Sequence, residues 1–260
     1  MKITIIGAGS IGGAMARGLL AKSVIPAGDL TLTTAHAETL EAYRPCGCRL
    51  TLDNREAVRG ADIVALAVKP WLVVPVVREI RDVIDYEAQT IVCIAAGMDS
   101  ATLIPEFGSP KIDFAYVIPN TAIEIGESVT FISPVGDMAP AKLKALEDIF
   151  GALGSSFTVP ASKLGAGTSL ASCGIAFAMR YARAAAEGGV ELGFKPAESL
   201  AIVEQTVIGA MKIMQAHGTH PEAEIYRVTT PGGLTIKGLN AMEKAGFTTA
   251  VIEGLKASKS

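Results

Sequence analysis

The 260-residue chain lacks a strong excess of charge of either sign, and it lacks a long uninterrupted apolar run. Its formal net charge is -3, and neither half has the basic excess of a protein that neutralises many phosphates. The longest uncharged stretch, Leu164–Met179, is short for a membrane span and is diluted by glycine and serine. We therefore expect no nucleic-acid partner and no membrane association.

Cysteine and histidine are also scarce, with four and three residues. Cys46 and Cys48 form a C-x-C pair and the other two cysteines stand alone, which is typical of neither a zinc site nor a disulfide framework. A reducing, cytoplasmic compartment fits this usage. His217 and His220 lie near a predicted helix end, where they satisfy terminal carbonyls more readily than they bind a metal. We predict no metal site, and no catalytic His–Asp pair is apparent.

Half of the residues are hydrophobic, which is ample for a large core. Up to residue 158, short β-branched runs alternate with helical patterns, as a sheet covered by helices on both faces requires. From residue 160 onward the pattern is helical only. We therefore predict an α/β fold, with a doubly wound sheet over residues 1–158 and an all-α domain over residues 159–260. The predicted strands are Lys2–Ile6, Leu30–Thr34, Ile63–Val68, Thr90–Ile94, Ile112–Ile118 and Val129–Ile132, and the predicted helices are Ile11–Lys22, Ala37–Tyr43, Trp71–Val83, Lys163–Leu192, Pro196–Ala216, Gly233–Ala245 and Thr248–Ala257.

The predicted helix around Arg180 carries charge on one narrow stripe, formed by Arg180, Arg183, Glu187 and Glu191. The rest of its circumference is apolar or small, so the helix has to be buried nearly all round. A central helix in a monomeric bundle would satisfy this pattern. We favour packing against a second copy of the chain, because a domain of about a hundred residues offers little cover of its own. The expected assembly is a homodimer, or a higher homo-oligomer built from dimers.

The first predicted strand is followed by Gly7-Ala8-Gly9-Ser10-Ile11-Gly12, which opens a helix. In a G-x-G-x-x-G turn, the first glycine permits the tight turn, the second admits a diphosphate to the backbone, and the third allows close helix–strand packing. The free amides at the helix start donate to the phosphates. The motif alone is often only a loop, but its strand–turn–helix context predicts a Rossmann-like dinucleotide domain. The contacts predicted are Gly7, Gly9, Ser10, Ile11 and Gly12.

The end of the second predicted strand indicates which dinucleotide binds. An acidic residue there would hold the ribose hydroxyls of NAD, but the strand ends in Thr33 and Thr34, and no acid appears before Glu38. The two hydroxyls and His36 can donate to a 2′-phosphate, so NADP is predicted, with NADPH preferred over NADH. Because no arginine is present at this point, use of both nucleotides stays open. His36 is equally compatible with a solvated loop.

Two further turns follow predicted strands, where ligands lie in doubly wound sheets. In Ala95-Ala96-Gly97, small residues would let a flat nicotinamide lie against the backbone. In Ala67-Val68-Lys69-Pro70, the lysine is either a functional cation at the crevice or a side chain extending from a helix start into solvent. We assign all seven residues to the cofactor site and keep Lys69 as a candidate catalytic residue.

The most unusual polar segment is Val228–Ile236, in which hydroxyls flank a Pro-Gly-Gly turn before a predicted helix. Free amides and hydroxyls at such a helix start can bind a small carboxylate. An ordinary helix cap after a turn is the alternative. We favour a binding site for an anionic substrate.

Taken together, the motifs resemble the pyrroline-5-carboxylate reductase family. The resemblance runs over essentially the whole chain through GAGSIG, AVKP, IAAG, PNT, QTV, HP and VTTPGGLTIKGL. It implies a Rossmann domain and a helical dimerisation domain. The leading function it implies is NADPH-dependent reduction of the cyclic imine 1-pyrroline-5-carboxylate to L-proline, the last step of proline synthesis. It also implies that Asn54 contacts the adenosine ribose and that substrate is bound by Asn120, Thr230, Gly233, Leu234 and Thr235, with Thr230 and Thr235 as catalytic residues.

The sequence departs from the family pattern at two segments. The run Tyr116–Ala122 stands where Arg-x-Met-Pro-Asn-Thr-Pro is usual, and Ala171–Phe177 stands where Ser-Gly-Ser-Gly-Pro-Ala-Tyr is usual. Three alternatives to the leading function therefore stay open. They are a reductase of a different cyclic imine, a short relative of the β-hydroxyacid dehydrogenases, and a non-catalytic NADP-binding regulator. The second would carry a catalytic lysine on the long helix, which here offers only Lys163 at its start.

Overall fold

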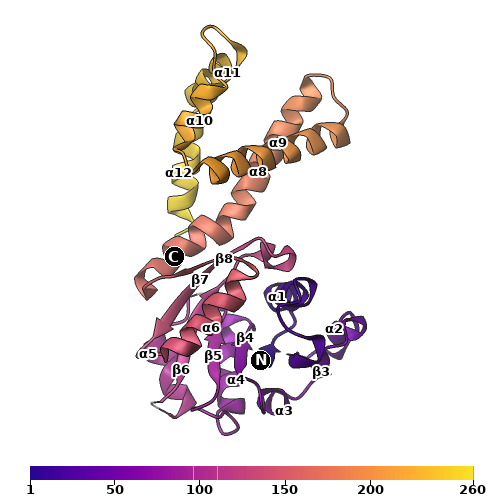
Figure 1. The fold of residues 1–260 in the computed structure, drawn as a ribbon, viewed down its shortest axis with the longest axis vertical. Helices are drawn as coiled ribbons and strands as arrows, with labels where there is room; N and C mark the ends of the chain where they lie inside the picture. Colours follow the sequence, from indigo (N-terminus) through magenta and orange to yellow (C-terminus); the bar gives the residue numbers. More distant parts are fainter. Residues whose placement is uncertain (96, 110, 260) are drawn as a thin grey trace. The chain divides into compact units, whose positions relative to one another are not determined.

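The computed structural model describes residues 1–95, 97–109 and 111–259 (Figure 1). These residues divide into two compact units, Met1–Ser172 and Cys173–Lys259. The secondary structure changes at an earlier point, since the last strand of the described residues ends at Thr158 and only helices follow.

The first unit is built on an eight-stranded sheet in the order β3-β2-β1-β4-β5-β6-β7-β8. Neighbours from β3 to β6 run parallel, β7 is antiparallel to β6, and β8 is parallel to β7. The first six strands have the 3-2-1-4-5-6 order of dinucleotide-binding sheets. The strands are β1 (Ile3–Ile6), β2 (Leu30–Thr33), β3 (Arg49–Thr51), β4 (Ile63–Leu66), β5 (Thr90–Cys93), β6 (Asp113–Ile118), β7 (Ser128–Val135) and β8 (Gly154–Thr158).

Helices cover both faces of this sheet (Figure 1). One core cluster joins α1 (Ser10–Ala21) and α6 (Pro140–Gly151) to the sheet through residues such as Met15 and Phe150. The other joins α3 (Asn54–Val58), α4 (Pro70–Ile80) and α5 (Ser100–Leu103) through Val58, Val77 and Leu103. The central strands are buried on both sides, which explains their nearly continuous apolar sequence. A short helix, α2 (Ala37–Glu41), follows β2.

All six predicted strands are present, whereas β3 and β8 were not predicted. Both lie at the edges of the sheet, and their sequences, Arg-Leu-Thr and Gly-Ser-Ser-Phe-Thr, contain no apolar run. An edge strand buries little surface, so it lacks the hydrophobic signal by which strands are found. The helices α3, α5 and α6 were likewise not predicted.

The second unit contains α8 (Gly174–Glu191), α9 (Pro196–His217), α10 (Pro221–Arg227), α11 (Leu234–Lys244) and α12 (Phe247–Ala257). The predicted helical segment Lys163–Leu192 is helical along its length, but it is not one regular α-helix. That stretch begins as α7 (Leu164–Gly167), passes through a π-helical segment at Thr168–Cys173, and only then becomes α8. The Thr168 hydroxyl donates to the Leu164 carbonyl (2.9 Å) and the Ser169 hydroxyl to the Gly165 carbonyl (3.3 Å), which competes with regular helix bonding.

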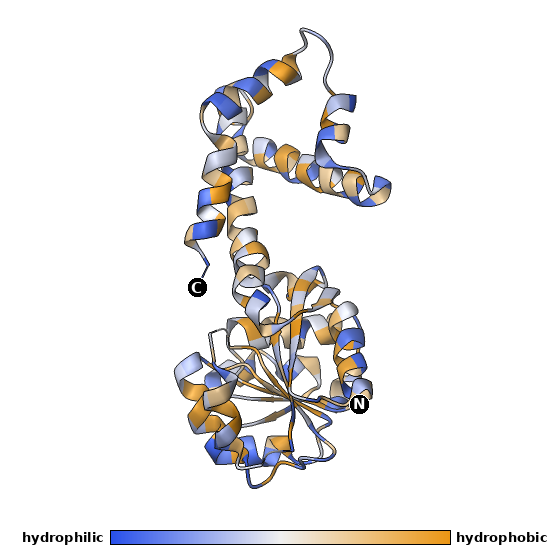
Figure 2. Cartoon of the chain, turned by 90° about the vertical axis from the view of Figure 1, so that its left-hand side faces the viewer, coloured by the Kyte–Doolittle hydropathy of each residue, from blue (hydrophilic) through white to orange (hydrophobic). Residues whose placement is uncertain are grey.

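The helices of the second unit leave much apolar surface in contact with water (Figure 2). No residue of α8 is buried, and Ser199 is the one buried residue of α9. Met179 is 66% exposed and Leu192 83%. Among the described residues, no helix has the length and apolarity needed to cross a membrane.

Candidate functional site

The turn between β1 and α1 is closed so tightly that only glycine fits at two of its positions. Gly7 has a φ of +110°, and a Cβ there would lie 2.7 Å from the Ala67 carbonyl oxygen. A Cβ on Gly12 would collide with the Gly7 carbonyl oxygen. The Gly7 amide donates to the Thr33 carbonyl (2.8 Å) and the Ala67 amide to the Ile6 carbonyl (2.8 Å). These bonds hold the ends of three neighbouring strands together.

Gly9 differs from the other two glycines because it faces open space. A Cβ there would meet no atom within 4 Å, and Gly9 and Ser10 are exposed. Gly9 also caps the 12-residue helix α1 without any side-chain hydrogen bond to the helix start. The first amides of α1 are therefore available, with the positive end of the helix dipole, to an anion that approaches over Gly9. This arrangement fits the diphosphate of a dinucleotide.

The residues predicted at the end of β2 occupy different surroundings. Thr33 is fully buried, and its hydroxyl donates to the Asn54 Oδ1 (3.0 Å), while the Asn54 amide donates to Glu79 (2.9 Å). Thr34 is half-buried and accepts from the His36 amide (3.4 Å). His36 is exposed, with its Nδ1 3.7 Å from a Glu38 carboxylate oxygen. Thr33 therefore orients Asn54, whereas Thr34 and His36 are open to a ligand.

The turns after β4 and β5 lie side by side, because the Ile94 amide donates to the Leu66 carbonyl (3.0 Å). Ala67 and Ala95 are buried and Val68 is half-buried. Lys69 is exposed and precedes Pro70, the first residue of α4. Gly97 has a φ of +78°, a conformation that favours glycine. Ala96, also predicted to bind the cofactor, lies outside the described residues.

A cavity of about 460 Å³ opens beside the turn after β5. Its wall combines the turn with residues of β6 and with the stretch that contains α7. The lining residues are Ala95, Gly97, Met98, Asp99, Ser100, Tyr116, Ile118, Ala161, Leu164, Gly165 and Thr168. Sequence reasoning singled out Tyr116 as a departure from the family pattern but did not find Asp99, Ser100 or Thr168. The strand-end position of Asp99 and Ser100, just past Gly97, was the available signal.

Asn120 is held by structural hydrogen bonds. Its Oδ1 accepts from the Ala122 amide (3.1 Å), and its Nδ2 donates to the Ala171 carbonyl (3.4 Å). The residue is 6% exposed. It therefore ties the end of β6 to the π-helical segment, and its predicted role in binding substrate stays a prediction.

The predicted carboxylate site lies in the second unit, where a tight turn leads into α11. The Gly233 amide donates to the Thr230 carbonyl (2.9 Å), and Gly232 has a φ of +69°. A Cβ on Gly233 would collide with the Thr230 hydroxyl. Gly233 caps α11 without a side-chain hydrogen bond, and Leu234 and Thr235 are exposed. We name this turn, residues 230–235, the α11 corner. It presents free amides and two threonine hydroxyls, as an anion-binding helix start does.

The two histidines of the second unit lie at helix ends, as predicted. His217 is the last residue of α9, with its Nδ1 3.0 Å from a Glu224 carboxylate oxygen, and Arg227 contacts both. His220 caps α10 by accepting from the Glu222 amide (3.3 Å). Hydrogen bonds from Thr219 and His217 lower the pKa of Glu224. Within residues 1–95, 97–109 and 111–259 no group of three or more possible metal ligands occurs.

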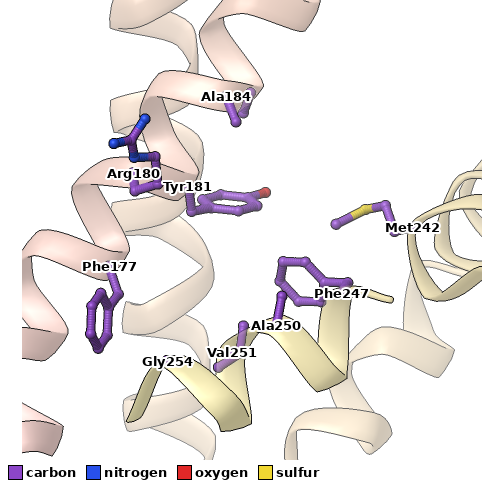
Figure 3. Close-up of a pocket in the computed structure, with 10 residues that line it drawn as sticks. Phe177, Arg180, Tyr181, Ala184, Met242, Phe247, Ala250, Val251 and Gly254 are labelled. Carbon is purple, nitrogen blue, oxygen red and sulfur yellow. The ribbon is translucent and has the colours of Figure 1, made fainter. Parts of the chain in front are cut away.

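Helices α8, α11 and α12 enclose an apolar groove (Figure 3). The Tyr181 and Phe247 rings lie 6.4 Å apart between centroids, and Met242 faces the same hollow. Arg180 is the charged residue of the lining. An exposed groove with so little polarity is typical of a surface that packs against another protein chain.

Two family models match the chain. Residues 2–97 match a model described as NADP oxidoreductase, coenzyme F420-dependent, and residues 161–260 match one described as pyrroline-5-carboxylate reductase dimerisation. The glycine turn and the sheet order agree with the first match. The chain is therefore an NAD(P)-dependent oxidoreductase, with a Rossmann-like NADP domain followed by a helical region. The second match indicates a homodimer.

Relatives that match nearly the whole of this chain show which family it belongs to. The chain is 33% identical to pyrroline-5-carboxylate reductase of Methanosarcina acetivorans, over 99% of this chain and 97% of the relative. It is also 33% identical to pyrroline-5-carboxylate reductase 1 of Dictyostelium discoideum, over 98% of this chain but only 48% of that longer protein. The chain belongs to the pyrroline-5-carboxylate reductase family.

The fold agrees with that of a solved pyrroline carboxylate reductase. The crystal structure of Plasmodium falciparum pyrroline carboxylate reductase with NADP bound superimposes with a TM-score of 0.88. The match covers 99% of this chain and 95% of that one, at 23% identity. At this identity the likeness concerns the fold.

Proposed function

We propose that the protein reduces 1-pyrroline-5-carboxylate to L-proline with NADPH. The observation that carries the proposal is the α11 corner, where a glycine packed against Thr230 leaves a helix start uncapped and two hydroxyls exposed. A corner of this kind binds a small carboxylate next to a hydrogen-bonding group. It lies within the region that matches the family's dimerisation model.

In this proposal the first unit holds the cofactor. The α1 amides and Gly9 take the diphosphate, and Thr34 and His36 take the 2′-phosphate. Asn54, oriented by Thr33, contacts the ribose. The turns at residues 67–70 and 95–97 position the nicotinamide, with Lys69 as the cation at the crevice. NADPH, when bound, supplies the hydride for a C=N carbon.

The α11 corner holds the substrate. The Thr230 hydroxyl and the amides of Leu234 and Thr235 bind the carboxylate, and the Thr235 hydroxyl faces the ring nitrogen. Orientation of this kind provides much of the rate enhancement when the reacting carbon is already electrophilic, as in a protonated imine. The proposal therefore needs no strong acid in the protein.

The test is an absorbance assay of NADPH loss with 1-pyrroline-5-carboxylate, on the full chain and on Thr235→Ala. We expect turnover by the unchanged protein. Removal of one orienting hydroxyl should lower kcat by about tenfold or more while the Kd for NADPH stays constant. Thr235→Ser should restore much of the rate because it returns the hydroxyl.

Thr248→Ala is the matched control. Thr248 is also the second residue of a helix in the same unit, but its hydroxyl donates to Glu243 (2.7 Å). Its loss should leave kcat unchanged. Equal rates for Thr235→Ala and the unchanged protein would remove Thr235 from the mechanism, and NADPH binding without turnover on any imine would favour a regulator.

A different cyclic imine is the second candidate. Tyr116 stands where the family pattern has arginine, and it lines the cavity beside the nicotinamide turn. Because a phenol and a guanidinium bind different groups, the assay should include a six-membered imine carboxylate. A higher kcat/KM for the six-membered ring would replace the leading proposal.

A further inference from the structure

The side chain of Tyr116 has a hydrogen-bonding group with no partner. Tyr116 is 4% exposed, and its hydroxyl oxygen is shielded from water and makes no hydrogen bond among the described residues. Its ring packs edge-on against Phe114, with 5.1 Å between centroids. A buried hydroxyl without a partner is costly, so it calls for an explanation, and a bound ligand is one.

The position of Tyr116 in the sheet indicates what that molecule is. In the 3-2-1-4-5-6 order, one nucleotide half lies over β1 to β3 and the other over β4 to β6. Tyr116 is on β6, directly opposite Cys93, the last residue of β5, and it shares the cavity with Ala95 and Gly97. The cavity therefore belongs to the half of the sheet that takes the nicotinamide.

Two other polar side chains of this cavity, those of Asp99 and Thr168, already make hydrogen bonds within the chain. Asp99 can only accept while ionised, and it already caps α5 by accepting from the Ala101 amide (3.1 Å). The Thr168 hydroxyl donates to the Leu164 carbonyl. Burial, with Cys93 and Asp99 nearby, raises the pKa of Tyr116 above its usual value, so the phenol keeps its proton at neutral pH.

We propose that the Tyr116 hydroxyl donates a hydrogen bond to the carboxamide oxygen of the bound nicotinamide and so fixes the orientation of the ring. This role rests on the NADPH-binding part of the proposed function and not on the identity of the imine. In this role Tyr116 positions the nicotinamide ring. From the sequence, Tyr116 is visible only as a departure from the arginine that is usual in the family pattern.

Because the Tyr116 hydroxyl is shielded from water, the contact requires a side chain of the cavity wall to move. Met98 and Leu164 are half-buried, line the cavity and pack against the core cluster that contains Tyr116. A methionine side chain is unbranched and adapts its rotamers easily. Movement of Met98 as the ring enters would expose the phenol to the carboxamide.

The test compares Tyr116→Phe with the unchanged protein by NADPH fluorescence titration and thermal unfolding, without any imine. Phenylalanine keeps the ring that packs on Phe114 and removes only the hydroxyl. We expect the Kd for NADPH to rise about five- to tenfold, since one hydrogen bond is lost. The Tm of the cofactor-free protein should stay equal or rise, because an unpartnered buried group is gone. Binding of 2′-phospho-ADP-ribose, which has no nicotinamide, should not change.

Ser133→Ala is the matched control. Ser133 is opposite Tyr116 on β7, is 1% exposed, and has the other buried hydroxyl without a partner among the described residues, but it does not line the cavity. Its removal should affect Tm in the same direction and leave the Kd for NADPH unchanged. An unchanged Kd in Tyr116→Phe, or equal losses for NADPH and 2′-phospho-ADP-ribose, would overturn the proposal.

A second measurement needs no variant. The thionicotinamide analogue of NADPH replaces the carboxamide oxygen with sulfur, which is a weak acceptor. The unchanged protein should bind this analogue several-fold more weakly than NADPH. Equal affinity would also refute the contact, whatever the substrate of the enzyme is.

Discussion

At the scale of single residues, the three motif glycines have different tasks. Gly7 and Gly12 are glycines because the chain itself occupies the space where a side chain would begin. Gly9 is bordered by open space, so the folded chain alone does not require glycine there. We propose that the diphosphate of a bound dinucleotide, which the strand–turn–helix motif places over this position, requires glycine there.

This distinction gives a residue-scale prediction for Gly9→Val. The backbone φ of -73° accepts valine, so the free energy of unfolding should change little. The side chain should block the diphosphate and raise the Kd for NADPH by at least roughly tenfold, as measured by fluorescence titration. Gly28→Val, also at an open position, is the control and should bind NADPH normally. NADPH affinity retained in Gly9→Val would refute the assignment of this turn.

At the scale of elements, α11 depends on where its glycines lie. Gly233 precedes the helix and packs against the Thr230 hydroxyl, whereas Gly238 lies within the helix and faces open space. A glycine inside a helix destabilises it relative to alanine. A substitution at Gly233 therefore tests the shape of the α11 corner, and a substitution at Gly238 tests the stability of the helix.

We expect Gly233→Ala to displace the Thr230 hydroxyl and raise the KM for 1-pyrroline-5-carboxylate by about tenfold, with the Kd for NADPH unchanged. Gly238→Ala should instead stabilise α11, by up to about 1 kcal/mol, without affecting KM. Steady-state kinetics and chemical denaturation on the two variants check this. The same KM in both would show that the corner does not bind the substrate.

At the scale of the whole molecule, the second unit exposes more apolar surface than a helical domain keeps in water. Helices α8 and α9 bury almost none of their residues within the chain, and the groove between Tyr181 and Phe247 is open. The narrow charged stripe on α8 predicted that the remaining, apolar surface of this helix has to be covered. The match to a dimerisation model indicates a homodimer, so a second copy of the chain is the partner we expect to cover this surface.

Met179→Glu tests the assembly. Met179 is 66% exposed in the single chain, so a charge there should leave the folding of the protomer intact. Burial of that charge between subunits should raise the dimer dissociation constant by about 100-fold or more. Sedimentation velocity measures this directly. The control is Ile125→Glu in the first unit, which is 65% exposed and should stay dimeric. A dimer of normal strength in Met179→Glu would place the interface elsewhere.

The sequence by itself determined the features that depend on local chemistry. The continuous apolar sequences of β1, β4 and β5 predict that these strands are buried. The glycine spacing at residues 7–12 predicts the tight turn between β1 and α1. The Thr-Thr-Pro-Gly-Gly segment likewise predicts the uncapped start of α11. Each of these patterns depends only on residues that are close together in the chain.

Only the tertiary structure decided which groups meet across the sheet. It joined the edge strands β3 and β8 to the fold, turned Thr33 inward to hold Asn54, and placed Tyr116 opposite Cys93 beside Gly97. These relations connect residues far apart in the chain. A hydrogen bond or its absence at such a place depends on strand register and packing, which no short stretch of sequence contains.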